Sequence, residues 1–220
     1  MRQSPSAILF DCSGVIIDSN FHQFISWKRL FEEEGVPFTM VDFQTKVSGG
    51  TREMGIRKMM GNISEERVQE MAQRKQKIFD QFIALDAPRP FSGIVELLST
   101  LQRRGVALAT VSASRNARIL LTRADLLSYF HTIVTPPVKP LIFSDEELYM
   151  RAMRELGKGP KECVVVEDSP VSIATAKKIG AFTIGIAIIA VPDALQQADR
   201  VVANHKELRD VLLEMFPTHK

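Results

Sequence analysis

Short apolar runs without polar alternation recur along the chain, and segments with a helical spacing of apolar residues separate them. The runs lie at residues 7–10, 106–111, 132–134, 163–166 and 182–186. Runs of this kind are typical of strands that are covered on both faces, as in a parallel sheet flanked by helices. The alternation of such strands with helices predicts an α/β fold with a doubly wound parallel sheet.

Two of the intervening helices carry boundary signals. Ser92 is expected to cap a helix that presents one apolar face and ends near Gly105. Pro170 suits the first position of a second helix, because the N–H group that proline lacks would have no helical partner there. Both helices connect predicted strands, as a parallel sheet requires.

One long segment departs from this alternation. Residues 20–87 contain no strand-like run, and their apolar residues recur at helical spacing on two faces, one formed by Phe24, Trp27, Leu30 and Phe31 and the other by Val68, Met71, Ala72, Ile78, Phe79 and Phe82. We predict a helical cap domain at residues 20–87, inserted into an α/β core domain formed by residues 1–19 and 88–220. We expect the insert to lie above the carboxyl ends of the strands, where open α/β sheets bind ligands.

Charge and cysteine content exclude several classes of protein. The 28 Lys and Arg residues nearly balance the 26 Asp and Glu residues, so nucleic acid and membrane surfaces are not expected partners. Cys12 and Cys163 both lie at predicted buried strands, which indicates reduced thiols in a cytoplasmic protein rather than a disulfide framework. The apolar stretch near the N-terminus is too short for a signal peptide or a membrane span.

Polar side chains follow three of the predicted strands in positions that suit chemistry. Asp11 follows the first strand and precedes Gly14, where a carboxylate can serve as a nucleophile, a metal ligand or simply a turn residue. The segment that begins at Ser112 offers hydroxyl and N–H groups that can bind a phosphate or only cap a helix. Lys139 could neutralise a phosphate, although a surface lysine is the simpler interpretation of this position alone.

A fourth predicted strand ends in two acids, Glu167 and Asp168. Two adjacent carboxylates are costly to hold together unless a cation compensates their charge. Capping of the next helix by Asp168 or Ser169 would explain only one of the two acids. Because Mg²⁺ prefers oxygen ligands, we favour a magnesium site at this strand end.

The order of these motifs resembles that of the haloacid dehalogenase-like (HAD-like) superfamily. The run Asp11-Cys12-Ser13-Gly14-Val15 resembles its Asp-x-Asp-Gly-Val opening, while Ser112, Lys139 and the pair Glu167-Asp168 match its second, third and fourth motifs. The helical insert is similar to the cap of the subgroup that includes β-phosphoglucomutase and CbbY-type phosphatases. The resemblance extends over nearly the whole chain.

The resemblance implies a Mg²⁺-dependent phosphoryl-transfer enzyme that forms a phosphoaspartate. Asp11 would be the nucleophile, and Ser112 and Lys139 would steady the transferring phosphoryl group. Mg²⁺ would be held by Asp11, by the carbonyl group of Ser13 and by Glu167 or Asp168. The expected partner is a small phosphorylated metabolite, and the expected assembly is a monomer or homodimer.

Candidate substrate-binding residues follow from the same resemblance. Ser114, Arg115 and Asn116 are close to the mutase-type form of the second motif, and Thr51 and Arg52 end a segment that resembles the specificity loop of the cap. Arg52 could grip a distal phosphate or carboxylate, with a solvated arginine as the alternative. Lys75 is a weaker candidate, for which a solvated helix face is the default interpretation.

Ser13 stands where phosphatases and mutases of the superfamily carry the aspartate that acts as general acid and base. The loss of general acid catalysis typically lowers the rate ~10²–10⁴-fold. Several explanations stay open: a slow phosphatase for substrates with good leaving groups, an acid borrowed from the cap, a binding protein that keeps the metal site, or an engineered change. His22 is the most obvious acid in the insert, although a packed histidine is the simpler interpretation. A sugar-phosphate mutase is the alternative enzyme, and the Glu167-Asp168 pair argues against a haloacid dehalogenase.

Overall fold

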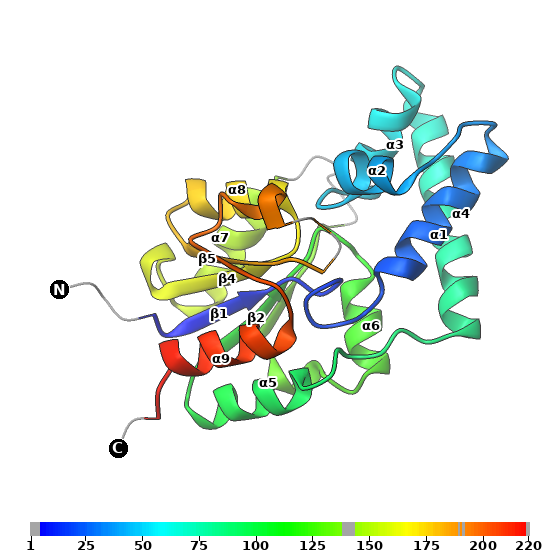
Figure 1. Cartoon of the computed structure of the whole chain (residues 1–220). Helices are drawn as coiled ribbons and strands as arrows, with labels where there is room; N and C mark the ends of the chain where they lie inside the picture. Colours follow the sequence, from blue (N-terminus) through cyan, green and yellow to red (C-terminus); the bar gives the residue numbers. More distant parts are fainter. Residues whose placement is uncertain (1–4, 138–143, 189, 191, 219–220) are drawn as a thin grey trace. The chain divides into compact units, whose positions relative to one another are not determined.

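The computed structural model describes residues 5–137, 144–188, 190 and 192–218. The chain divides into two compact units, which are the α/β unit, Met1–Ile17 with Pro90–Lys220, and the helical unit, Asp18–Arg89. These limits lie within two residues of the boundaries expected from the sequence. Figure 1 shows the strands and helices of both units.

Six parallel strands form the sheet of the α/β unit. They are β1 (Ala7–Phe10), β2 (Ala107–Val111), β3 (Thr132–Val134), β4 (Cys163–Glu167), β5 (Phe182–Ile186) and β6 (Arg200–Val202). Their order is β3-β2-β1-β4-β5-β6, so the predicted doubly wound α/β fold is confirmed. β6 was not predicted, because an exposed arginine and a half-buried valine leave only Val202 fully buried in that strand.

Helices cover both faces of this sheet (Figure 1). α7 (Asp145–Leu156) and α8 (Pro170–Lys178) lie over one face, and α5 (Ile94–Arg103) and α9 (His205–Met215) lie over the other. α6 (Ala117–Arg123) and a short 3₁₀ turn, η2 (Leu127–Tyr129), connect β2 to β3, while η3 (Pro160–Glu162) precedes β4 and η4 (Pro192–Leu195) follows β5. Each strand is thus joined to the next strand of the chain by a connection that contains helical structure.

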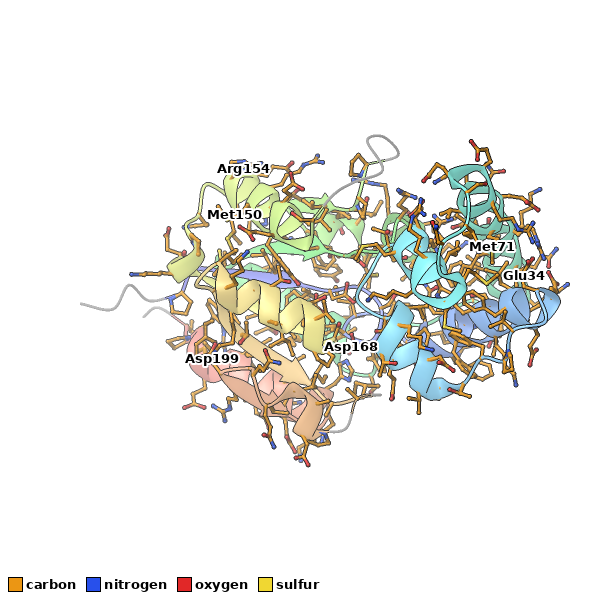
Figure 2. All side chains as sticks on the ribbon, turned by 90° about the horizontal axis from the view of Figure 1, so that it is seen from above. Glu34, Met71, Met150, Arg154, Asp168 and Asp199 are labelled. Carbon is orange, nitrogen blue, oxygen red and sulfur yellow. The ribbon has the colours of Figure 1, made fainter. Side chains whose placement is uncertain are left out.

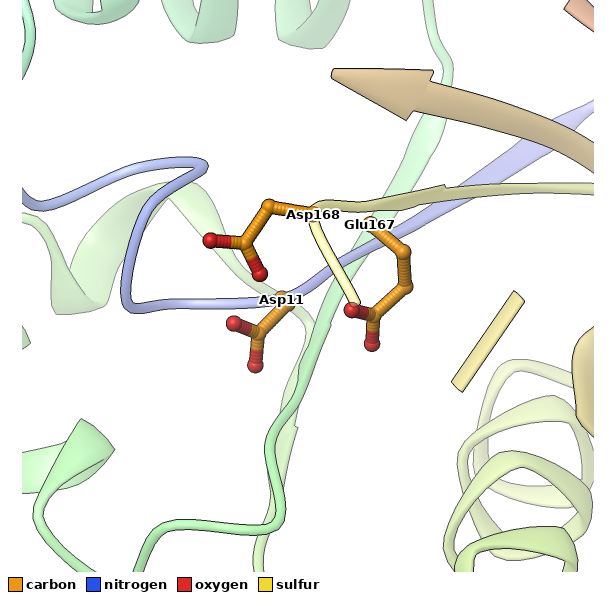
Figure 3. Close-up of side chains that lie close together, drawn as sticks. All are labelled: Asp11, Glu167 and Asp168. Carbon is orange, nitrogen blue, oxygen red and sulfur yellow. The ribbon is translucent and has the colours of Figure 1, made fainter. Parts of the chain in front are cut away.

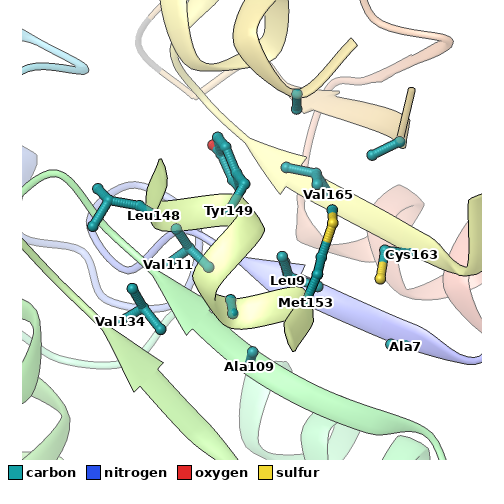
Figure 4. Close-up of a cluster of buried hydrophobic side chains, with 13 residues drawn as sticks. Ala7, Leu9, Ala109, Val111, Val134, Leu148, Tyr149, Met153, Cys163 and Val165 are labelled. Carbon is teal, nitrogen blue, oxygen red and sulfur yellow. The ribbon is translucent and has the colours of Figure 1, made fainter. Parts of the chain in front are cut away.

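One hydrophobic core lies between the sheet and α7 (Figure 4). Alternate residues of the strands point into it, because successive side chains of a strand face opposite sides of the sheet. The core contains Ala7, Leu9, Ala109, Val111, Val134, Cys163 and Val165 from the strands, and Leu148, Tyr149, Ala152 and Met153 from α7. This packing fixes the position of α7 on the sheet.

The two predicted helix boundaries have different outcomes. Pro170 begins α8, as predicted. Ser92 does not cap α5, since the N-cap residue is Gly93, with φ +80°, and Ser92 is exposed. Glycine adopts this left-handed conformation at little cost, so the entry into α5 depends on backbone freedom rather than on a capping hydroxyl.

The helical unit contains α1 (Asn20–Glu33), α2 (Met40–Asp42), a π-helical turn η1 (Phe43–Val47), α3 (Arg52–Met60) and α4 (Glu65–Leu85). α1 packs against α4, and most of the apolar residues that the sequence placed on their two faces are buried, among them Leu30, Phe31, Met71 and Phe79. Glu34, which Figure 2 labels together with Met71, pairs with Arg74 of α4. No helix among the described residues combines the length and the apolar character that a bilayer span requires.

Candidate active site

The strand order reverses between β1 and β4. From β1 the chain proceeds outward through β2 and β3, and it then returns to β4 on the other side of β1. Phe10 pairs with Val166 in register, and the N–H group of Asp11 donates to the carbonyl oxygen of Val166 at 3.0 Å. Open α/β sheets bind ligands at the carboxyl end of such a reversal. Asp11 and the end of β4 therefore lie side by side at the ligand-binding edge of the sheet.

Three carboxylates converge at this edge (Figure 3). Asp11, Glu167 and Asp168 each offer one oxygen atom, and these atoms all lie within 4.8 Å of one another. Glu167 is buried, with 4% of its surface exposed, while Asp11 and Asp168 are half-buried. Asp168 lies two residues before the start of α8 (Figure 2). The structure thus brings together three of the residues that were selected from the sequence.

This donor set fits a magnesium ion. Mg²⁺ binds oxygen at about 2.1 Å, so two ligands on opposite sides of the ion stand about 4.2 Å apart. The upper limit of 4.8 Å between the three oxygens exceeds that spacing only slightly, and small side-chain rotations would close the difference. Three carboxylates held together also repel one another, and a divalent cation would relieve that repulsion.

The alternative of a helix cap is not observed at the end of β4. Ser169 occupies the N-cap position of α8, but its side chain makes no capping hydrogen bond. Asp168 contributes to the carboxylate cluster. The hydroxyl group of Ser169 therefore does not cap α8, and both acids of the pair belong to the carboxylate cluster.

Strand periodicity explains why Glu167 points inward. Cys163 and Val165 face α7, so Glu167, two residues further along β4, faces the same side. There its Oε1 atom accepts a hydrogen bond of 2.6 Å from the hydroxyl group of Tyr149. Tyr149 was not among the residues selected from the sequence. The period of β4 and the apolar face of α7 were the signals that could have found it.

The turn after Asp11 is closed by backbone hydrogen bonds. The carbonyl oxygen of Cys12 accepts from the N–H groups of Ile16, at 2.9 Å, and Ile17, at 2.8 Å. Gly14, with φ +86°, donates to the carbonyl oxygen of Ile17 at 3.0 Å. None of these bonds uses the side chain of Ser13, which is half-buried. Backbone hydrogen bonds and the left-handed conformation of Gly14 therefore close the turn.

Cys12, next to Asp11, offers no reactive thiol at this edge of the sheet. Its side chain is fully buried, and burial together with the neighbouring Asp11 raises the pKa of the thiol well above its usual value. A buried thiol of this kind is inert toward substrate.

The segment after β2 begins with a buried serine, Ser112, of which 3% is exposed. The N–H group of Ser114 donates to Ser112 Oγ at 3.3 Å, and the N–H group of Asn116 donates to Ser114 Oγ at 3.2 Å. Two of the N–H groups expected to bind phosphate are thus bonded within the segment, and phosphate binding by the segment stays a prediction. Each hydroxyl group already accepts a hydrogen bond here, and its O–H group can still donate.

Two further candidates flank this segment. The Nε atom of Arg115 donates to the carbonyl oxygen of Pro137 at 3.3 Å, and the side chain is half-buried. Asn116, with 4% exposed, is the N-cap residue of α6. Lys139 lies outside the described residues.

Thr51 and Arg52 begin α3 of the helical unit. Thr51 is the N-cap residue, and its Oγ1 atom accepts a hydrogen bond of 3.3 Å from the N–H group of Met54. Arg52 is half-buried, and its Nη1 atom donates to the carbonyl oxygen of Ala72 on α4 at 3.2 Å. Arg52 is therefore held against α4 and is not a fully solvated arginine.

The default interpretation of Lys75 as a solvated residue is wrong, since only 1% of it is exposed. It lies one turn from Met71 on the apolar face of α4, where helical spacing places it inside the unit. Its Nζ atom donates to Gln23 Oε1 and lies 5.0 Å and 4.8 Å from the ring centres of Trp27 and Phe79. Burial, with a smaller contribution from Arg52, holds the pKa of Lys75 well below its usual value.

His22 is a packed histidine of the helical unit. Only 7% of it is exposed, and its Nε2 atom lies 3.6 Å from the carboxylate of Asp86. Its ring also meets that of Phe21 edge to face, with 6.2 Å between the centres. These contacts all lie within the helical unit.

Residues 5–180 match the family profile of haloacid dehalogenase-like hydrolases. The chain belongs to this family. The HAD-like chain is 28% identical over 187 residues to β-phosphoglucomutase of Bacillus subtilis, with 82% of each chain covered. It is 26% identical over 220 residues to the phosphorylated carbohydrates phosphatase of Thermotoga maritima, covering 96% of this chain and 99% of the relative.

A solved structure supports the same fold. The crystal structure of β-phosphoglucomutase from Clostridium difficile matches this HAD-like chain with a TM-score of 0.84 and 21% identity, over 96% of this chain and 97% of the other. Family and relatives together confirm the prediction that the protein is a phosphatase or phosphoryl-transfer enzyme of the HAD-like superfamily.

Proposed function

We propose that this protein is a Mg²⁺-dependent phosphohydrolase of small, sugar-phosphate-like metabolites, with reduced activity because Ser13 replaces the general acid. The convergence of the Asp11, Glu167 and Asp168 oxygens within 4.8 Å carries the proposal. A bound Mg²⁺ would neutralise charge on the phosphoryl oxygens. Asp11, Glu167, Asp168 and the carbonyl group of Ser13 would hold it.

The chain's own residues would divide the reaction into two steps. A carboxylate oxygen of Asp11 attacks the phosphorus atom, and the bond from phosphorus to the leaving oxygen breaks. Water then attacks the phosphorus atom of the aspartyl phosphate, which releases inorganic phosphate and restores Asp11. Ser112 and Lys139 would steady the transferring phosphoryl group, because catalysis of phosphoryl transfer depends mainly on positioning and charge compensation.

Ser13 affects both steps. A serine hydroxyl group is too weak an acid to protonate a departing alkoxide at neutral pH, and it is too weak a base to activate the attacking water. Substrates whose leaving group departs as a stable anion depend least on that proton. We therefore expect measurable turnover of aryl phosphates and slow turnover of sugar phosphates.

We assign the binding of the substrate's non-reacting part to Ser114, Arg115 and Asn116 of the α/β unit and to Thr51 and Arg52 of the helical unit, which we propose to be the cap. Arg52 is half-buried and donates to a main-chain carbonyl group of α4, and the planar guanidinium group matches the geometry of a carboxylate or phosphate. The free state of both cysteines is in keeping with a reducing compartment, for which we propose the cytoplasm. An assembly of one or two copies stays a prediction.

Two other functions rest on particular observations. Similarity to β-phosphoglucomutase of Bacillus subtilis favours a sugar-phosphate mutase, although a mutase depends most on the acid that Ser13 replaces. The serine at position 13, in place of the general acid, favours a catalytically impaired protein that binds a phosphorylated metabolite. A mutase would isomerise a sugar phosphate without releasing phosphate, and a binding protein would retain the metabolite unchanged.

The test compares the parent with the Ser13→Asp variant on p-nitrophenyl phosphate and on a panel of sugar phosphates in Mg²⁺. General acid catalysis contributes about 10²–10⁴-fold, so the variant should gain that order of turnover on sugar phosphates and less on the aryl ester. Ser13→Ala is the matched control and should equal the parent. Asp11→Asn should abolish turnover in either background.

Two results would contradict the proposal. If the parent and the Ser13→Asp variant both bind Mg²⁺ and neither hydrolyses any of these phosphate esters, the proposed enzyme class is wrong. Turnover that persists in the Asp11→Asn variant would remove Asp11 as the nucleophile.

A further inference from the structure

A buried hydrogen bond links the carboxylate cluster to α7. The hydroxyl group of Tyr149 donates to Glu167 Oε1 at 2.6 Å, and the two residues are only 3% and 4% exposed. An O–H···O⁻ distance of about 2.5–2.7 Å is typical of a charge-assisted hydrogen bond. Tyr149 therefore makes a strong contact with one member of the cluster.

The tyrosine ring is fixed independently of the cluster. It belongs to the hydrophobic core formed by α7 and the strands, together with Leu148, Met153 and Val165 (Figure 4). A tyrosine side chain has two main torsions, and close packing restricts both. The core thus sets the position of the hydroxyl group, and the hydroxyl group in turn selects one orientation of the Glu167 carboxylate.

Glu167 needs such a partner for a physical reason. A buried carboxylate loses its hydration, and this is costly unless other groups replace the lost hydrogen bonds. A glutamate side chain also has three torsions, so it loses considerable rotamer freedom when it is fixed as a ligand. A partner that fixes it beforehand reduces the cost of binding a cation.

We propose that Tyr149 is a positioning residue that presents the Glu167 carboxylate to the cation and makes the site selective for Mg²⁺ over Ca²⁺. The proposal rests on the magnesium site of the proposed function. Mg²⁺ requires near-ideal octahedral geometry, whereas Ca²⁺ accepts variable geometry. A fixed glutamate therefore favours Mg²⁺, and a mobile glutamate weakens Mg²⁺ binding more than Ca²⁺ binding.

The test measures dissociation constants for Mg²⁺ and Ca²⁺ by calorimetric titration of the full chain. Loss of an outer hydrogen-bond partner typically lowers metal affinity about 10–100-fold. Tyr149→Phe keeps the ring and should weaken Mg²⁺ binding by that factor, with a smaller loss for Ca²⁺. The chain has two tyrosines, so Tyr129→Phe is the matched control and should leave both constants unchanged.

A merely structural role for Tyr149 would weaken both ions equally, and that result would overturn the proposal. Unchanged constants in the Tyr149→Phe variant would overturn it as well, while the magnesium site itself would stand. A parent that binds no Mg²⁺ would overturn both the site and the positioning role.

A second measurement does not depend on the folding of a Tyr149 variant. In the Tyr129→Phe protein Tyr149 is the remaining tyrosine, so a tyrosine difference spectrum on addition of Mg²⁺ reports its hydroxyl group. Binding of the ion by Glu167 should perturb that spectrum, and Asp168→Asn should abolish the change. An unperturbed spectrum at saturating Mg²⁺ would overturn the proposal.

Discussion

Replacement of Asp168 by asparagine should stabilise the metal-free protein while it removes Mg²⁺ binding. The three carboxylate oxygens lie within 4.8 Å of one another. At an effective dielectric constant of about 20, two unit charges at that distance repel by roughly 3.5 kcal/mol. Asp168→Asn removes two of the three repulsive pairs. Because Asp11 and Asp168 are half-buried, solvent and salt screening reduce the gain to about 1–3 kcal/mol.

Differential scanning calorimetry with and without Mg²⁺ measures both effects. One kcal/mol shifts the melting temperature of a protein of this size by about 2–4 °C, so the metal-free variant should melt roughly 2–12 °C above the parent. A ligand at a hundredfold excess over its dissociation constant stabilises the folded state by about 2.7 kcal/mol. The parent should therefore gain several degrees on addition of Mg²⁺, and the variant should gain little.

Glu214→Gln is the matched control, because it removes one negative charge from an exposed position on α9 of the same unit. It should change neither the metal-free melting temperature nor the response to Mg²⁺. The reasoning is refuted if Asp168→Asn melts at or below the parent without metal and still responds to Mg²⁺ as the parent does.

The remaining predictions concern the helical unit, which contains the single tryptophan, Trp27, so that its fluorescence follows unfolding. Burial and Arg52 lower the pKa of Lys75 in the folded state below 10.5, the value of an exposed lysine. Between these two pKa values the unfolded state binds a proton that the folded state lacks, so the free energy of unfolding of the parent increases as pH rises toward 10.5. Lys75→Met should therefore be more stable than the parent at low pH, by a margin that shrinks toward that pH; a margin independent of pH would contradict this. A Cβ atom at Gly55 would lie 2.9 Å from Val47 Cγ1. Gly55→Ala should lower the unfolding midpoint, because overpacking costs about 1–3 kcal/mol and the helix propensity gained is about 1 kcal/mol; a higher midpoint would argue against the close contact.

Local sequence patterns predicted much of the fold. Five strands, the α/β class and the helical insert follow from apolar runs and their spacing, because burial on two faces leaves a continuous apolar signature. Failures arose where the signature was weak or absent. β6 is short and only partly buried, and the entry into α5 depends on the left-handed conformation of Gly93 rather than on Ser92.

The sequence by itself also determined which side chains end up at one edge of the sheet. Asp11 and Ser112 each follow a strand, Glu167 ends a strand and Asp168 follows it, and parallel strands place their carboxyl ends together. The order of the strands along the chain and the residues at their ends can be read from the sequence, and the alternation with helices indicates that the strands are parallel.

Only the tertiary structure decided how these side chains are held. Periodicity indicates which faces of α7, β4 and α4 are buried, but only the packing of distant segments brings the Tyr149 hydroxyl group to Glu167 and the Lys75 Nζ atom close to two aromatic rings. Backbone N–H groups near Ser112 were expected to bind a phosphate, and the folded segment uses two of them internally. The sequence identifies the side chains that are able to bind a metal or take part in catalysis. Packing between distant segments sets the orientation, the solvation and the charge of these side chains.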